Sequence, residues 1–267
     1  MIKDITLGQY IPGKSPLHKS DPRIKIILTV LFMIVLFIVD TYMEFVMVLS
    51  FTLLVVATSG IPLKYVLKGL KPVLIILIFT GVINIFTVKG TPLFELWHIR
   101  ITYEGIETTV KLALRLVLLI MAASLLTLTT TPIALTDGVE KLMGALKRFG
   151  FPAHEVAMMM SIALRFIPTL LDETDKIMRA QAARGADFDT GNLVQRAKSF
   201  IPVLVPLFVS AFRRADELAL AMESRCYRGG AGRTRLRQLK LTRVDFYISV
   251  VMVLFSFIIF YLRYMKV

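Results

Sequence analysis

The sequence predicts an all-α membrane protein with about five transmembrane helices and a cytoplasmic unit of two or three long amphipathic helices. Three observations support this fold class. The 267 residues are 56% hydrophobic, with a mean hydropathy of +0.70, which exceeds that of soluble domains. Five apolar runs recur along the chain. The net charge of +13 is concentrated in alternate connecting segments, as in multi-pass proteins.

The five apolar runs are predicted to cross the membrane at residues 24–39, 45–58, 72–88, 109–130 and 246–262. The first two are shorter than the ~20 residues of a typical spanning helix. Lys25 and Tyr42 extend them, because long cationic and aromatic side chains reach the membrane interface. A very short acidic turn, from Asp40 to Glu44, joins these two runs as a helical hairpin.

Charge orients the crossings. The net charge is +3 for residues 1–25, −2 for 40–44, +3 for 64–71, zero for 89–111 and +7 for 132–243. Positive segments lie on the cytoplasmic side, and short loops carry most of this signal. We therefore expect the amino terminus and residues 132–243 in the cytoplasm, and the carboxy terminus outside.

Three domains follow from this topology. Residues 1–131 form an amino-terminal arm and transmembrane helices 1–4, residues 132–243 form the cytoplasmic unit, and residues 244–267 form transmembrane helix 5. Within the cytoplasmic unit, Thr131-Pro132 indicates a helix stop and restart. A short amphipathic helix is expected at 136–148, and Gly150 and Pro152 are expected to end it.

Two long helices are predicted in the cytoplasmic unit. Apolar residues at three-and-four spacing indicate an amphipathic helix over residues 153–184, and residues 193–225 repeat the theme. The stretch 200–212 is almost uncharged but too short to cross a bilayer. Pro202 and Pro206 are expected to kink it.

Each long helix ends in the same pattern of an arginine between small residues. The first ending is Ala183-Arg184-Gly185 and the second is Ser224-Arg225-Cys226. Gly185 is placed where a left-handed residue would cap the helix. One arginine at a helix carboxy terminus is favourable without any partner. Two similar endings suggest two arginines that dock into two carboxylate-lined grooves of a pseudo-symmetric partner, such as an ATPase dimer.

No catalytic, cofactor-binding or metal-binding residues are predicted. Residues 8–15 fit the phosphate-loop pattern, but Pro12 removes a backbone donor and no parallel α/β pattern follows. His154-Glu155 lacks the second histidine of a zinc protease motif. The acids Asp172 to Asp175 alternate with nearby cations, as on a solvated helix face. Nucleic-acid binding is not expected, because no such motif occurs and topology accounts for the charge.

The chain resembles a known family, the transmembrane T component of energy-coupling factor (ECF) transporters. At the front, residues 7–10 (Leu-Gly-Gln-Tyr) and residues 15–25 look like the opening of that family. The paired arginine motif of the family, in which small residues flank the arginine, matches residues 183–185 and 224–226. Cys226 departs from the more usual glycine or serine, but it is still small.

The resemblance implies a function and partners. The chain would be the energy-coupling subunit of a vitamin or micronutrient importer in a bacterial or archaeal cell membrane. Its partners would be two ABC-type ATPases, which bind the ATP, and a small membrane substrate-binding protein, the S component. Ala183, Arg184, Gly185, Ser224, Arg225 and Cys226 would bind the ATPases. The chain itself would neither hydrolyse ATP nor select the substrate.

Two alternatives remain open from the sequence. One is the permease subunit of an ordinary ABC importer, which would normally carry one coupling helix with a glycine-containing motif. The other is a multi-pass membrane enzyme that uses the acids at Asp172–Asp175. Identification of the proteins that copurify with the chain would separate these hypotheses.

Overall fold

A computed structural model describes residues 10–96, 99–144, 148, 150–188, 192–229 and 239–265. They belong to two compact units. The membrane unit comprises Gly8–Val139 and Gln238–Val267, and the described part of the helix-pair unit lies within Glu140–Arg237. The domain boundaries predicted at residues 132 and 243 mark where the chain is expected to leave and to re-enter the membrane. The division into compact units does not test them, so they stay a prediction.

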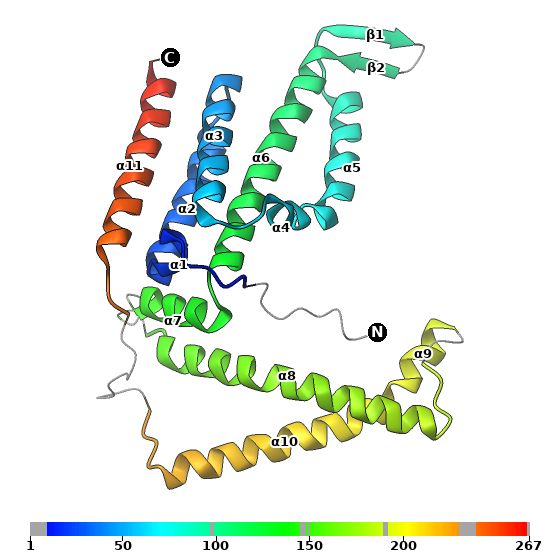
Figure 1. Ribbon diagram of the computed structural model, residues 1–267. Helices are drawn as coiled ribbons and strands as arrows, with labels where there is room; N and C mark the ends of the chain where they lie inside the picture. Colours follow the sequence, from blue (N-terminus) through cyan, green and yellow to red (C-terminus); the bar gives the residue numbers. More distant parts are fainter. Residues whose placement is uncertain are drawn as a thin grey trace. The chain divides into compact units, whose positions relative to one another are not determined.

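The elements are labelled in Figure 1. In the membrane unit, the helices are α1 (Pro16–Lys19), α2 (Pro22–Ile38), α3 (Tyr42–Ser59), α4 (Leu63–Lys68), α5 (Lys71–Thr87), α6 (Tyr103–Thr129) and α11 (Arg243–Tyr264), with strands β1 (Pro92–Leu96) and β2 (Ile99–Thr102). Helix α7 (Pro132–Met143) extends from this unit into the next. The helix-pair unit contains α8 (Ala153–Ala183), α9 (Leu193–Ser199) and α10 (Ile201–Ser224).

The membrane unit is a bundle of α2, α3, α5, α6 and α11, which lie side by side in Figure 1. Its main core is apolar, and Leu36, Val48, Leu118 and Ile259 are at most 1% exposed. These four residues come from α2, α3, α6 and α11, so the helices pack on one another through continuous side-chain contact. Helix α5 packs mainly along α6.

The helices of this bundle begin at residues suited to cap them. Asp21 accepts the N–H of Arg23, and Pro22 occupies the first turn of α2, where a missing N–H costs nothing. Thr41 and Glu44 form a capping box at the start of α3. The Glu44 carboxylate accepts the N–H groups of Asp40 and Thr41 at 3.0 and 3.1 Å. The acidic turn thus fixes the α2–α3 hairpin.

A short β-hairpin stands where the sequence indicated only a loop. Strands β1 and β2 pair antiparallel between α5 and α6. The hydroxyl of Thr102 donates to the carbonyl of Val88 at 2.7 Å and accepts the N–H of Gly105. Helix α6 therefore begins at Tyr103, six residues before the predicted start at 109. This cap is a local signal that an apolar run does not contain.

Charged groups near one end of the bundle pair with one another. Arg115 donates to the carbonyl of Val39 at 2.6 Å and lies 3.3 Å from the Asp40 carboxylate. Glu107, an acid on the same helix as Arg115, pairs with Lys111 at 2.7 Å. Arg115 thus crosses to the α2–α3 turn, away from its own helix.

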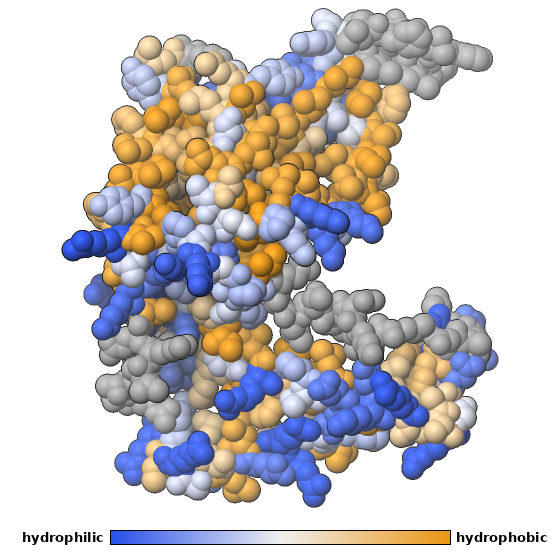
Figure 2. Space-filling view, viewed as in Figure 1, coloured by the Kyte–Doolittle hydropathy of each residue, from blue (hydrophilic) through white to orange (hydrophobic). Residues whose placement is uncertain are grey.

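Hydropathy agrees with a protein that crosses a membrane. By length and composition, α3, α6, α8 and α11 qualify as candidate spans, and α5 is a shorter apolar helix of 17 residues. Helix α2 also has 17 residues and a mostly apolar sequence. The five predicted crossings therefore correspond to α2, α3, α5, α6 and α11, whose exposed surfaces in Figure 2 are largely hydrophobic. The predicted all-α membrane fold is confirmed, with the hairpin as an addition.

The helix-pair unit differs from the predicted boundaries in three places. Helix α7 spans Pro132–Met143, earlier than the predicted 136–148. The second long helix is divided at Phe200 into α9 and α10. Pro202 consequently lies in the first turn of α10, where it starts a helix, and only Pro206 lies inside it.

Candidate functional site

Helix α8 ends in a Schellman motif built around Arg184. The N–H of Gly185 donates to the carbonyl of Ala182, and the N–H of Ala186 donates to that of Gln181, both at 3.0 Å. Gly185 has a φ of +91°, as the predicted left-handed cap requires. Arg184 is therefore the C-cap residue, directly before the left-handed Gly185, and it is exposed.

Helix α10 ends in the same way around Arg225. The N–H of Cys226 donates to the carbonyl of Glu223 at 2.8 Å, and that of Tyr227 donates to Met222 at 3.0 Å. Cys226 has a φ of +53°, so it plays the part that Gly185 plays in α8. The two arginine endings thus share one backbone geometry, although their sequences agree only in part.

Both arginines are presented to solvent. All six predicted site residues, Ala183, Arg184, Gly185, Ser224, Arg225 and Cys226, are exposed. Within the described parts of the chain, neither guanidinium forms an ion pair or a side-chain hydrogen bond. Each carries five donors in a planar fork, which fits a carboxylate from outside.

Helices α8 and α10 pack in opposite directions. Glu173 of α8 accepts hydrogen bonds from Ser210 at 2.5 Å and from Arg214 at 2.7 Å, both on α10. Nearer the end of α8, the amide of Gln181 donates to the carbonyl of Pro202, near the start of α10, at 3.4 Å. The carboxy-terminal half of one helix therefore lies against the amino-terminal half of the other, as Figure 1 shows.

This packing places the two arginines at opposite ends of the pair. Arg184 follows Glu173 by 11 residues, and Arg225 follows Arg214 by 11 residues. With a rise of ~1.5 Å per residue, each arginine lies about 16 Å from the Glu173–Arg214 contact, in opposite directions. The separation between them is thus roughly 30 Å, which exceeds the reach of one binding groove.

The same helices carry exposed apolar faces. Val205, Phe208, Val209 and Phe212 of α10 are 57–69% exposed, and Met159 of α8 is 58% exposed. Contiguous apolar surface of this kind marks a contact with another protein or with a membrane. The helix-pair unit therefore offers two kinds of surface, the arginine ends and the apolar faces between them.

The other candidate sites find no support in the described residues. The phosphate-loop pattern begins at Gly8, outside the described part, but the N–H of Ile11 donates to the carbonyl of Leu128 and so is not available to a phosphate. Glu173, in the acidic cluster, is bound to Ser210 and Arg214. His154 hydrogen bonds to Glu140 at 3.2 Å. No group of three or more potential metal ligands occurs in the described ranges.

Comparison with known proteins gives the family. The sequence matches the family CbiQ, described as cobalt transport protein, over residues 13–236. It is 62% identical to the energy-coupling factor transporter transmembrane protein EcfT of Ruminiclostridium cellulolyticum, over 96% of each chain. This chain belongs to the EcfT family. The EcfT protein of Bacillus subtilis is 45% identical, over 98% of this chain and 100% of its own length.

Membership of the EcfT family confirms the resemblance inferred from the two arginine motifs and the amino-terminal residues. The chain is the energy-coupling transmembrane subunit of an ECF transporter, a transport protein that crosses the membrane several times. As a component of such a transporter it works in a complex. The structure adds two features that the sequence did not predict, the shared backbone geometry and the spacing of the arginines.

Proposed function

We propose that this chain is the non-catalytic subunit through which two ABC-type ATPases drive a small membrane S component that binds the substrate. The observation that carries the proposal is the pair of like helix endings, with exposed, unpaired arginines roughly 30 Å apart. One groove cannot receive both arginines. Two similar grooves, one on each ATPase of a dimer, suit them.

In this mechanism the helix pair transmits the motion of the ATPases to the S component. ATP, which is bound by the ATPases and not by this chain, closes the ATPase dimer and moves its two grooves. Arg184 and Arg225 follow the grooves, because a planar guanidinium held by carboxylates resists displacement. The α8–α10 contact at Glu173 serves as the pivot between the arginines. A change in the crossing of the helices then shifts their exposed apolar faces, against which the S component lies.

Charge and the arrangement of the membrane unit support one membrane orientation. Ile11 of the amino-terminal arm hydrogen bonds to the carbonyl of Leu128, and Val66 of α4 packs against Leu125 and Leu128. The arm and α4, which carry most of the short-loop lysines, thus lie at the same end as the carboxy terminus of α6. We assign this end, together with residues 132–243, to the cytoplasm and the carboxy terminus to the outside.

Charge reversal tests the docking sites. The double variant Arg184→Glu, Arg225→Glu places a negative charge at both helix ends. Removal of one partner from a buried charge pair commonly costs ~2–5 kcal/mol of binding free energy. We expect this variant, purified from membranes with a tag, to lose the ATPases and to abolish uptake in cells.

A matched control makes the same two arginine-to-glutamate changes at other positions of α8 and α10. Arg165→Glu with Arg213→Glu alters exposed arginines on the same two helices, more than ten residues before Arg184 and Arg225. This control should retain both ATPases. An intact complex with full transport in the Arg184, Arg225 double variant would refute the proposed docking. Copurification of the native chain with an external binding protein, and without an S component, would favour an ordinary ABC importer.

A further inference from the structure

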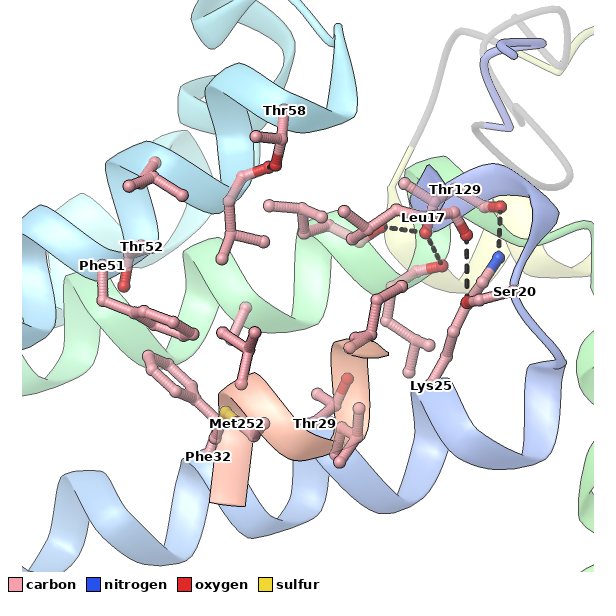
Figure 3. A pocket seen from close by; sticks show the side chains of 18 of the residues that line it. Leu17, Ser20, Lys25, Thr29, Phe32, Phe51, Thr52, Thr58, Thr129 and Met252 are labelled. Atoms are coloured by element: carbon pink, nitrogen blue, oxygen red, sulfur yellow. Dashed lines mark hydrogen bonds between the residues drawn. The ribbon is translucent and has the colours of Figure 1, made fainter. Parts of the chain in front are cut away.

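A cavity of about 280 Å³ lies within the membrane unit. Helices α2, α3, α6 and α11 form its walls, and α1 closes one end with Leu17 and Ser20. Figure 3 shows the side chains of these elements converging on the space. The coupling mechanism proposed above does not use this cavity.

The walls of the cavity suit hydrocarbon. Phe32, Leu125 and Met252 are among the lining residues and are nearly buried. The lining hydroxyl groups of Thr52 and Thr129 donate to carbonyls of their own helices, at 2.8 and 2.7 Å. These threonines therefore turn no free donor toward the cavity. A polar ligand would lose its own hydrogen bonds there, whereas an apolar chain would not.

The cavity is short along the helix axes. Lys25 and Phe32 line it seven residues apart on α2, a span of about 10 Å. Phe51, on the wall, stacks on Phe255 of α11 with ring centroids 4.1 Å apart, so α3 and α11 meet at this level. A helix cannot lie along the gap past this contact, whereas a flexible acyl chain can enter beside it.

The cavity opens to the surface between α3 and α11. Leu54 of α3 is 60% exposed, Val251 of α11 is 54% exposed, and both also line the cavity. Surface residues of these helices face the hydrocarbon of a bilayer in a protein that spans it. A lipid chain can enter sideways from the membrane by this route.

The end of the cavity at α1 is cationic. Lys25 is 8% exposed, and its Nζ donates to the carbonyl of Thr129 at 3.0 Å and to the hydroxyl of Thr130 at 3.3 Å. An ammonium group has three donors, so one remains. In the described part of the chain, no carboxylate oxygen lies within 4 Å of this Nζ, and the acids Asp21 and Asp245 act on it only from farther away. Exposed Lys19 and Arg243 adjoin the same end, next in sequence to elements that line the cavity.

We propose that the cavity binds one acyl chain of an anionic phospholipid, with its phosphate at the Lys25 end. The Lys25 ammonium keeps one donor beyond its two bonds to the protein, and a phosphate oxygen accepts it. The lipid comes from the membrane leaflet that meets the amino-terminal ends of α2 and α11. Once bound, it fills the space between α3 and α11, where the protein itself leaves a gap.

Photolabelling tests the site on the unaltered chain. The full-length protein is placed in nanodiscs that contain phosphatidylglycerol with a diazirine in one acyl chain, and labelled peptides are identified by mass spectrometry. We expect the label on α3 and α11 around Leu54 and Val251. Label spread evenly over all exposed apolar helices, α5 included, would overturn the proposal, because it would show ordinary bilayer contact.

Native mass spectrometry with matched variants tests separately how the cavity binds the acyl chain and how it binds the anionic headgroup. Val251→Trp places a bulky ring at the opening, whereas Val253→Trp alters a residue of equal exposure outside the cavity lining. Only Val251→Trp should lower retained phosphatidylglycerol, by about tenfold, the loss expected when about two methylene groups no longer fit. Lys25→Met should abolish the preference for phosphatidylglycerol over phosphatidylcholine, and Lys71→Met should not.

Two results would overturn the proposal. One is equal retention of phosphatidylglycerol by the Val251→Trp and Val253→Trp variants. The other is a photo-crosslink from Leu54 to a membrane protein of the assembled transporter, with no lipid label, which would assign the opening to a protein partner.

Discussion

At the scale of single residues, Cys226 is the only non-glycine residue of the described chain with a positive φ, at 53°. The left-handed region is unfavourable for most side chains by about 1–2 kcal/mol. Its presence here follows from the Schellman ending of α10, which needs a left-handed residue immediately after Arg225. The backbone geometry of the arginine ending, and not only the small size of the cysteine side chain, therefore constrains which residue can stand at position 226.

Substitutions at Cys226 should follow this backbone requirement. Cys226→Gly should stabilise the end of α10 by roughly 0.5–1 kcal/mol, because glycine adopts a positive φ without strain. Cys226→Val should weaken it by about 1–2 kcal/mol. Limited proteolysis after α10 and thermal unfolding of the purified chain measure both changes.

The control for this series is Ser224→Val, two residues earlier, at the last residue of α10. It should cost only a few tenths of a kcal/mol, the difference in helix propensity. Equal losses at Ser224 and Cys226 would mean that the backbone conformation at Cys226 is not what matters.

The sequence predicted the residues of the arginine endings but not all of their geometry. Gly185 indicated a left-handed cap, because glycine is common there. Cys226 carried no such signal, since cysteine does not favour a positive φ. The roughly 30 Å separation of the arginines depends on which residues of α8 and α10 meet. The Glu173–Arg214 contact decides that, and periodicity cannot supply it.

At the scale of elements, the start of α2 is tied to the start of α11. Asp245, 2% exposed, accepts the N–H of Asp21 at 2.7 Å and also the N–H of Thr242 at 2.7 Å. Asp21 in turn pairs with Arg23 at 2.7 Å. These bonds join segments more than 200 residues apart, so they fix the last transmembrane helix against the first.

Acid should loosen this junction. The hydrogen bonds and the charge of Arg23 hold the pKa of Asp21 below its ordinary value of 3.8, although burial opposes them. A lowered pKa stabilises the fold above the unfolded-state value, and this contribution is lost as the pH falls through the folded-state pKa. The melting temperature should therefore fall below about pH 4. The Asp21→Asn variant should show a smaller fall between pH 5 and 3, and an identical fall would contradict this role.

Helix existence was predictable and several helix boundaries were not. The five apolar runs gave α2, α3, α5, α6 and α11, because burial in a bilayer requires long uncharged helices. Helix α6 starts at Tyr103, and not at the predicted residue 109, because Thr102 caps it. The division at Phe200 places Pro202 in the first turn of α10, where a proline is tolerated. The β-hairpin was missed because its strands are short and carry no clear alternation.

At the scale of the whole molecule, the short segments at one end of the membrane unit carry an excess of positive charge, whereas those at the other end do not. The lysines of α4 and of the amino-terminal arm share one end, whereas the other end holds Asp40 with Arg115 and the Glu107–Lys111 pair. The rule for topology counts lysine and arginine in short loops, so the end that is rich in lysine is the one proposed to lie in the cytoplasm. Topology is therefore a property of the summed charges and not of any one residue.

The lone cysteine provides a direct test of topology. Cys226 is exposed and is the single cysteine of the chain. A membrane-impermeant maleimide should label it in inverted vesicles and leave it unlabelled in intact, right-side-out vesicles. The Cys226→Ser, Met265→Cys variant should show the reverse pattern, since the proposed carboxy terminus is external. Labelling of Cys226 from outside would overturn the orientation.

Thiol reactivity at the two helix ends tests the central claim most directly. Cys226 reports on the α10 ending, and Ala183→Cys in the Cys226→Ser background reports on the α8 ending. Alkylation rates are measured for the isolated chain and for the complex with both ATPases. Both thiols should react readily in the isolated chain and become protected in the complex, because a docked interface excludes solvent. Unchanged reactivity at either end, in a complex that retains both ATPases, would contradict docking at that arginine.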